Sequence, residues 1–269
     1  MRYRLIALDI DGTIRSVHHP LTDRTRSAID AARAKGAIVT IATGRMFKSA
    51  ISSTTELDLQ SPIISFQGAH IADPESGEVL WHQPLTKSMM LTALNALHNW
   101  KGDIVSYHGD RVFVSKVTPW VKAYSERNRG GLKVVSDLKE MASKKPTRIV
   151  AVGEDSAVES LTAQLKEQFE SELHVTRSLP HFCEILHPES GKHRALAWLC
   201  RYLDIDERET IAFGNGYNDV DMLKWAGLGV AVGDAVAEAL NVADRIAPPM
   251  EEDGAARVLE DLLQQGLVG

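Results

Sequence analysis

The stretch LIALDIDGTI, residues 5–14, is an apolar run that ends in two aspartates, Asp9 and Asp11, separated by one isoleucine. Such a run predicts a buried strand with two carboxylates at its end. Two neighbouring negative charges lose solvation there and repel each other, unless a cation compensates them or one carboxyl keeps its proton. We therefore expect a metal site at the end of this strand.

The two ends of the chain both alternate between strand-like and helix-like segments. Near the start, strands are expected at 3–8, 37–42 and 61–66, with helices at 22–35 and 45–57 between them. Near the end, strands are expected at 210–214, 228–232 and 245–247, with helices at 193–203, 219–225 and 235–242. Residues 1–83 and 188–269 are therefore predicted to form one α/β core with a doubly wound, mainly parallel, Rossmann-like sheet.

The alternation of strand-like and helix-like segments changes between residues 84 and 187. DIVSYHGDRVFVS, residues 103–115, places Gly109 and Asp110 between two β-rich runs, which is typical of a hairpin. TRIVAVG, residues 147–153, predicts a further strand and is followed by a helical pattern over 156–170. Residues 84–187 are therefore predicted to be an inserted α+β domain.

Composition narrows the class of protein. Of the 269 residues, 44% are hydrophobic and 25% are charged, as in ordinary globular proteins, and the net charge of -6 argues against general nucleic-acid binding. No apolar stretch has the length of a secretory signal or a membrane span, so we expect a cytoplasmic protein, and no obligate protein partner is inferred. Cys183 and Cys200 are far apart and form no CxxC pattern, which predicts two buried thiols.

Four polar clusters follow predicted strands. They are Asp9 with Asp11, residues 43–45, residues 67–68, and GNGYND at 214–219. In an open α/β sheet, ligands bind beyond the carboxyl ends of the strands, where the strand order reverses. If the first strand lies between the second and the fourth, three of these clusters converge on one pocket.

The chemistry of such a pocket follows from its residue types. Thr43 and the free N–H groups at the start of the next helix would bind a phosphate. Asp9, Asp219 and the amide of Asn215 supply the oxygen ligands that Mg²⁺ prefers. One carboxylate beside a bound phosphoryl group can attack phosphorus, and a second can protonate the leaving oxygen and later activate water. Each polar residue taken alone is more commonly a turn former or a helix cap, so it is their combination that favours a site.

At these residues the sequence resembles the haloacid dehalogenase superfamily, in particular its Cof-type phosphatases with a large α/β cap. DIDGT resembles the first motif, which implies that Asp9 is the nucleophile and that Asp11 is the general acid/base, with its main-chain carbonyl on the metal. ATGR, residues 42–45, resembles the second motif and implies that Thr43 binds phosphate and Arg45 lines the pocket. EILHPESGKHRAL, residues 184–196, implies that Lys192 neutralises the charge of phosphate and nucleophile.

GNGYND resembles the fourth motif and implies a metal shell of Asp9, Asp11, Asn215 and Asp219. Three positions depart from the family pattern. Asn215 replaces a usual aspartate, which predicts weaker metal binding, whereas Gln67 replaces asparagine and His193 replaces glycine, which we expect to adjust the pocket entrance. The predicted phosphate- and substrate-binding residues are Gly12, Thr43, Gly44, Arg45, Lys192 and Asn218.

The combined expectation is a Mg²⁺-dependent phosphatase that acts on a small phosphorylated metabolite, such as a sugar phosphate, through an aspartyl phosphate on Asp9. Residues 84–187 would form a cap that closes over the site and contacts the leaving group. Two alternatives remain open: a phosphomutase, and a non-catalytic phosphometabolite-binding protein suggested by Asn215. A dehalogenase is disfavoured because Asp11 and the phosphate-binding residues would have no purpose in it.

Overall fold

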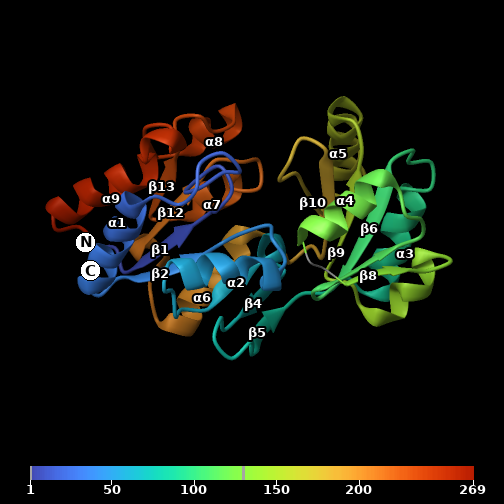
Figure 1. Cartoon of the computed structure of the whole chain (residues 1–269), viewed down its shortest axis with the longest axis horizontal. Helices are drawn as coiled ribbons and strands as arrows, with labels where there is room; N and C mark the ends of the chain where they lie inside the picture. The colour runs from blue at the N-terminus through green and yellow to red at the C-terminus, as the bar shows by residue number, and fades with distance from the viewer. Residues whose placement is uncertain (1, 129–130) are drawn as a thin grey trace. The chain divides into compact units, whose positions relative to one another are not determined.

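The computed structural model describes residues 2–128 and 131–269, and the chain divides into two compact units (Figure 1). The first unit consists of residues up to 45, 50–80 and 191–269, and the second consists of residues 46–49 and 81–190. The main breaks in the chain lie a few residues outside the boundaries expected from the sequence. The role of the second unit as a cap that contacts the leaving group of the substrate stays a prediction.

The first unit is built on a parallel five-stranded sheet with the order β14-β13-β12-β1-β2. Its strands are β1 (Leu5–Leu8), β2 (Ile38–Ile41), β12 (Thr210–Gly214), β13 (Leu228–Ala231) and β14 (Arg245–Ile246). Leu8 of β1 lies opposite Ile41 on one side and Phe213 on the other. The central place of the first strand is confirmed, and the polar residues that follow β1, β2 and β12 start from one edge of the sheet.

Helices connect these strands in a doubly wound, Rossmann-like arrangement, as the sequence predicted. They are α1 (Asp23–Ala34), α2 (Phe47–Glu56), α6 (Lys192–Leu203), α7 (Val220–Trp225), α8 (Ala237–Val242) and α9 (Gly254–Gln264), with 3-10 turns at Glu207–Glu209 and Met250–Glu252. α1 begins after Thr22, whose hydroxyl accepts from the backbone N–H of Thr25. Its buried residues recur at helical spacing, and this face packs against α9 (Figure 1).

A small antiparallel sheet extends the core beyond β2. It has the order β3-β4-β5, with β3 at Ile63–Ser65, β4 at His70–Ala72 and β5 at Val79–His82. β3 runs parallel to the end of β2, where the N–H of Thr43 donates to the carbonyl of Ile64 at 2.9 Å. The parallel third strand is therefore confirmed, and it places the turn at Phe66–Gly68 beside Thr43.

The second unit contains a six-stranded mixed sheet with the order β10-β11-β9-β6-β7-β8. Its elements are α3 (Lys87–Ala96), β6 (Asp103–His108), β7 (Arg111–Val114), α4 (Pro119–Asn128), β8 (Gly131–Val134), a 3-10 segment (Leu138–Lys144), β9 (Arg148–Val152), α5 (Asp155–Phe169), β10 (His174–Thr176) and β11 (Phe182–Leu186). β6 and β7 form the predicted hairpin, with Gly109 at a φ of +57° in its turn. The predicted strand and helix that follow are β9 and α5.

The second unit has an aliphatic core of its own. Side chains from one face of β9 and β11, among them Ile149 and Ile185, pack with α3, α5 and the 3-10 segment. Cys183 lies in this core and Cys200 is buried in α6, and both are free thiols, as predicted. Among the residues described, no helix combines the length and the apolar character needed to cross a membrane.

Candidate active site

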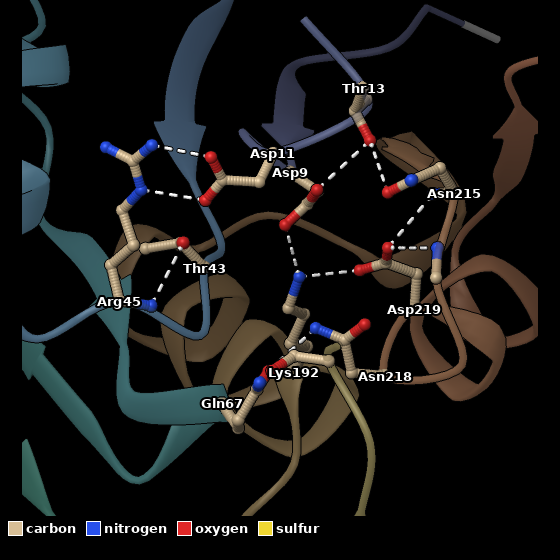
Figure 2. A network of polar contacts seen from close by, with 12 residues as sticks. Asp9, Asp11, Thr13, Thr43, Arg45, Gln67, Lys192, Asn215, Asn218 and Asp219 are labelled. Atoms are coloured by element: carbon tan, nitrogen blue, oxygen red, sulfur yellow. Dashed lines mark hydrogen bonds and ion pairs between the residues drawn. The ribbon is translucent and has the colours of Figure 1, made fainter. Parts of the chain in front are cut away.

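A buried lysine lies between two buried carboxylates where β1 and β12 end. The Nζ atom of Lys192 is 2.6 Å from Oδ1 of Asp9 and 2.6 Å from Oδ1 of Asp219 (Figure 2). The three residues are 2%, 5% and 0% exposed, respectively. The cation required at the end of the first strand is thus at least partly supplied by the protein itself.

When both carboxylates are ionised, this cluster carries one negative charge in excess. Burial raises the pKa of Asp9 to about 7, with a further contribution from Asp219 that the neighbouring Lys192 opposes. Burial would lower the pKa of Lys192, but the two carboxylates hold it above its ordinary value. The lysine therefore stays charged. A second cation would stabilise the ionised carboxylate of Asp9.

Two glycines permit the position of Lys192, which is the first residue of α6. Gly191 precedes it with a φ of +137°, and Gly68 has a φ of +86°. A Cβ atom on Gly68 would lie 2.2 Å from the carbonyl oxygen of Gly191 and 2.8 Å from the N atom of Lys192. The turn after β3 therefore packs directly on the backbone that presents the lysine, and a side chain there would displace it.

Asp219 fixes the loop between β12 and α7. Its Oδ2 atom accepts from the backbone N–H groups of Asn215 and Gly216, at 3.0 and 2.9 Å, while its Oδ1 atom faces Lys192. A Cβ on Gly214 would lie 2.6 Å from the Cβ of Asp219, so the loop closes tightly. Both oxygens of Asp219 thus have protein partners, and the assignment of this residue to the metal shell stays a prediction.

Asp11 points away from the lysine and forms an ion pair with Arg45. The guanidinium donates through Nε and Nη2 to the two carboxylate oxygens, at 2.7 and 2.5 Å. The Asp11 side chain is half exposed, whereas Asp9 is buried. Thr43, which is 1% exposed, accepts from the N–H of Arg45 through its hydroxyl at 3.2 Å. The two carboxylates of DIDGT thus have different surroundings, as separate chemical roles require.

Two acceptor oxygens beside Asp9 depend on a single hydroxyl donor, that of Thr13. The hydroxyl of Thr13 lies 3.1 Å from Oδ2 of Asp9 and 3.2 Å from Oδ1 of Asn215, so two acceptor oxygens share one hydroxyl proton. Asn215 approaches this closely because Gly12 has no side chain: a Cβ there would lie 2.2 Å from its Nδ2. This arrangement fits a hard cation such as Mg²⁺.

A metal bound here could not rely on acidic side chains alone. In the described part of the chain, no three His, Cys, Asp or Glu side chains gather in a way that could hold a metal ion. The predicted donors are Asp9, Asp219, the amide oxygen of Asn215 and the main-chain carbonyl of Asp11. The predicted metal shell thus includes two neutral oxygens, and it stays a prediction.

The sequence reasoning assigned no role to Thr13 and did not predict the hydrogen bond of Gln67. Thr13 belongs to the quoted DIDGT stretch, so its hydroxyl beside the aspartates was available as a signal. Gln67 was expected to adjust the pocket entrance, which stays a prediction; it is 1% exposed, and its Oε1 accepts from Nδ2 of Asn218 at 2.9 Å. His193 is partly exposed, with its Nδ1 4.0 Å from Asp221, and its predicted role is untested.

Comparison with known proteins gives matches along nearly the whole chain. The model of a family described as haloacid dehalogenase-like hydrolase matches residues 6–259. The chain is 27% identical to the 5-amino-6-(5-phospho-D-ribitylamino)uracil phosphatase YitU of Bacillus subtilis, with 96% of each protein covered. It is 28% identical to an HMP-PP phosphatase of Cronobacter sakazakii, with 88% of this chain and 86% of that protein covered.

Solved structures share the fold. A haloacid dehalogenase-like hydrolase from Bacteroides thetaiotaomicron superposes with a TM-score of 0.81 at 26% identity, covering 97% of this chain and 100% of the other. A sugar phosphatase of HAD subclass IIB gives a TM-score of 0.83 at 23% identity, with 98% and 100% covered. These likenesses support the architecture seen here, a Rossmann-like core that carries a large insertion.

The bridging role of Lys192 predicts a large loss of stability when its charge is removed. Lys192→Met leaves two buried carboxylates without their cation, which we expect to lower the free energy of unfolding by about 3–5 kcal/mol. Urea denaturation followed by circular dichroism, with a chelator present, measures this. Lys224→Met, which removes an exposed lysine of α7, serves as the control. Equal stability of the two variants would contradict the bridging role.

Proposed function

Because this chain belongs to the haloacid dehalogenase-like hydrolase family, we propose that it is a Mg²⁺-dependent phosphatase of a small phosphorylated metabolite. The observation that carries the proposal is the buried Asp9 carboxylate, held by Lys192 at the carboxyl end of the central strand. Two relatives bear the names of phosphatases that act on small phosphorylated molecules, which supports the substrate class. A cytoplasmic location stays a prediction.

The first chemical step is assigned to Asp9. One oxygen of its carboxylate attacks the phosphorus atom of the substrate, the bond from phosphorus to the leaving oxygen breaks, and an aspartyl phosphate forms. Two contacts support this role: Lys192 holds Oδ1 and Thr13 donates to Oδ2, so the orientation of the carboxylate is fixed before the substrate binds. The ammonium group of Lys192 also lies where negative charge accumulates during the transfer.

The proton transfers are assigned to Asp11. Its protonated carboxyl donates to the leaving oxygen, and the resulting carboxylate then takes a proton from the water that attacks the aspartyl phosphate. This second attack breaks the bond between phosphorus and the Asp9 oxygen and releases inorganic phosphate. Because Arg45 holds Asp11 in the structure, Asp11 must exchange this partner for the substrate before the reaction. Its half-exposed position allows that movement.

The phosphate group is assigned to the segment after β2. Thr43 has a buried hydroxyl, and the chain turns there into α2, so the hydroxyl and the neighbouring N–H of Gly44 form the proposed anion site. Gly12 and Asn218 are assigned to the same pocket from the side of β1 and of β12. Arg45 would add positive charge at its edge once Asp11 has released it.

The metal is assigned to the oxygens around Asn215. Asp9, Asp219, the amide of Asn215 and the main-chain carbonyl of Asp11 would hold Mg²⁺, which would supply positive charge to the phosphoryl oxygens. The shared proton of Thr13 supports this assignment, because a cation would satisfy both acceptor oxygens at once. Asp219 contributes by holding Lys192 and the backbone of the loop.

Phosphate release tests the proposed function directly. The purified protein should release phosphate from p-nitrophenyl phosphate and from members of a panel of phosphorylated metabolites, and addition of a chelator should abolish the release. Binding of phosphorylated metabolites without release would instead identify a non-catalytic binding protein. A strict requirement for a bisphosphate activator would identify a phosphomutase.

The role of Asp11 predicts a defect that depends on the leaving group. Asp11→Asn should slow hydrolysis of alkyl phosphates by about 10²–10⁴-fold, the usual contribution of general acid–base catalysis. The defect in formation of the aspartyl phosphate should shrink for p-nitrophenyl phosphate, whose leaving group needs little protonation. Steady-state and burst kinetics with both esters measure this, with the fully exposed Asp23→Asn as the control. Equal defects in the two bursts would contradict the acid role.

Because asparagine replaces the usual aspartate at position 215, we expect weak metal binding, which the substitution Asn215→Asp should strengthen. Asn215→Asp adds a full negative charge beside the metal, so we expect the Mg²⁺ concentration for half-maximal activity to fall by about tenfold or more. Mg²⁺ binding followed by calorimetry should change in parallel, which gives a readout apart from activity. Asn241→Asp, at an exposed position of α8, is the control. An unchanged Mg²⁺ affinity in Asn215→Asp would remove residue 215 from the metal shell.

A further inference from the structure

Gln67 occupies a place in the site to which the chemistry above assigns no function. It follows β3, it is 1% exposed, and its Oε1 atom accepts from Nδ2 of Asn218 at 2.9 Å. A Cβ on Gly44 would lie only 2.2 Å from the Nε2 atom of Gln67. The amide therefore lies between the segment after β2 and the loop after β12 (Figure 2).

The backbone conformation at Gln67 is unfavourable for this residue type. Its φ is +57° and that of Phe66 is +50°, so two consecutive residues other than glycine are left-handed. Asparagine tolerates this conformation better than glutamine, because its short polar side chain can hydrogen-bond locally. The backbone conformation at position 67 thus favours asparagine over glutamine. The longer glutamine side chain is present instead, and its extra length lets its amide contact Asn218.

Both ends of Gln67 are attached to parts of the site. At its base, the N–H of Gln67 donates to the carbonyl of Thr43 at 3.1 Å, and the N–H of Phe66 donates to the carbonyl of Arg45 at 2.9 Å. At its tip, the amide accepts from Asn218, which directly precedes Asp219 in the loop that holds Lys192. One side chain thus spans the segment that carries the proposed anion site and the loop whose Asp219 holds Lys192.

We propose that Gln67 is a positioning residue that sets the distance between the phosphate cradle at Thr43 and Gly44 and the Asn218–Asp219 loop. The inference rests on the proposed phosphatase function, because it concerns the same bound phosphate. The amide of Gln67 accepts from Asn218 and lies against Gly44, so it acts through these two residues. A displacement of either segment by a fraction of an ångström would move the phosphate relative to Asp9 and Lys192, and such displacements reduce catalysis strongly.

Two substitutions at position 67 separate the effect of side-chain length from the effect of the hydrogen bond. Gln67→Asn keeps the amide and suits the left-handed backbone, but its side chain is shorter by one methylene group and loses the contact with Asn218. Gln67→Met keeps the approximate length and loses the hydrogen bond. Asn218→Ala removes the same bond from the other side, at a partly exposed position. Gln60→Asn, at an exposed glutamine of the same unit, is the matched control.

The experiment measures the dissociation constant of inorganic phosphate by calorimetry with Mg²⁺ present, together with kcat and KM for p-nitrophenyl phosphate. We expect Gln67→Asn and Gln67→Met to weaken phosphate binding about tenfold and to lower kcat/KM by about 10–100-fold, with unchanged binding stoichiometry. The double variant Gln67→Asn/Asn218→Ala should lose less than the two single losses combined, because both single substitutions remove the bond between Gln67 and Asn218.

A merely structural role would give a different pattern. Partial unfolding lowers kcat and the binding stoichiometry, but it leaves KM and the phosphate dissociation constant of the folded molecules unchanged. A phosphate affinity within twofold of the wild type in both position-67 variants would overturn the proposal, and so would additive losses in the double variant. If the wild type releases no phosphate, the proposed function fails, and the phosphate affinities still decide the role of Gln67.

Discussion

The interaction on which the site depends is the contact of one buried ammonium group, that of Lys192, with two buried carboxylates. Removing Asp9 and Asp219 from water is costly, and the ammonium group of Lys192 in direct contact with both offsets part of this cost. The chain meets this requirement through the close approach of Gly68 to Gly191, which lets α6 begin at the lysine. The adjacency of β1 and β12 brings the two carboxylates within reach of the same Nζ atom.

A second buried ion pair lies in the inserted unit, and its charge balance differs from that around Lys192. Arg148 and Glu184 lie 2.5 Å apart on β9 and β11, 5% and 0% exposed, and the guanidinium also stacks on the ring of Tyr107. One positive and one negative charge balance there, within a single sheet. At Lys192, one positive charge faces two carboxylates, and burial, with a further contribution from Asp219, raises the pKa of Asp9 to about 7. The unbalanced charge favours a metal-binding site over a purely structural one.

The convergence of the polar clusters could be predicted from the sequence because it depends on strand direction alone. Parallel strands end at one edge of a sheet, so Asp9, Thr43 and the loop 214–219 had to meet once the first strand was central. The side-chain partners could not be predicted in the same way. Whether Asp11 faces Arg45 or the pocket, and whether Gln67 reaches a loop 151 residues away, depends on rotamers and on packing that no local pattern encodes.

The central claim is that Asp9 carries the phosphoryl group during turnover. The direct measurement is rapid quenching of the protein during hydrolysis of p-nitrophenyl phosphate, followed by borohydride reduction and mass spectrometry of the peptides. Borohydride reduces an acyl phosphate to an alcohol, so the account predicts a reduced side chain at position 9, which disappears when substrate is omitted. Reduction at Asp11 or Asp219 instead, or a quenched enzyme without any modified carboxylate despite an observed burst, would contradict it.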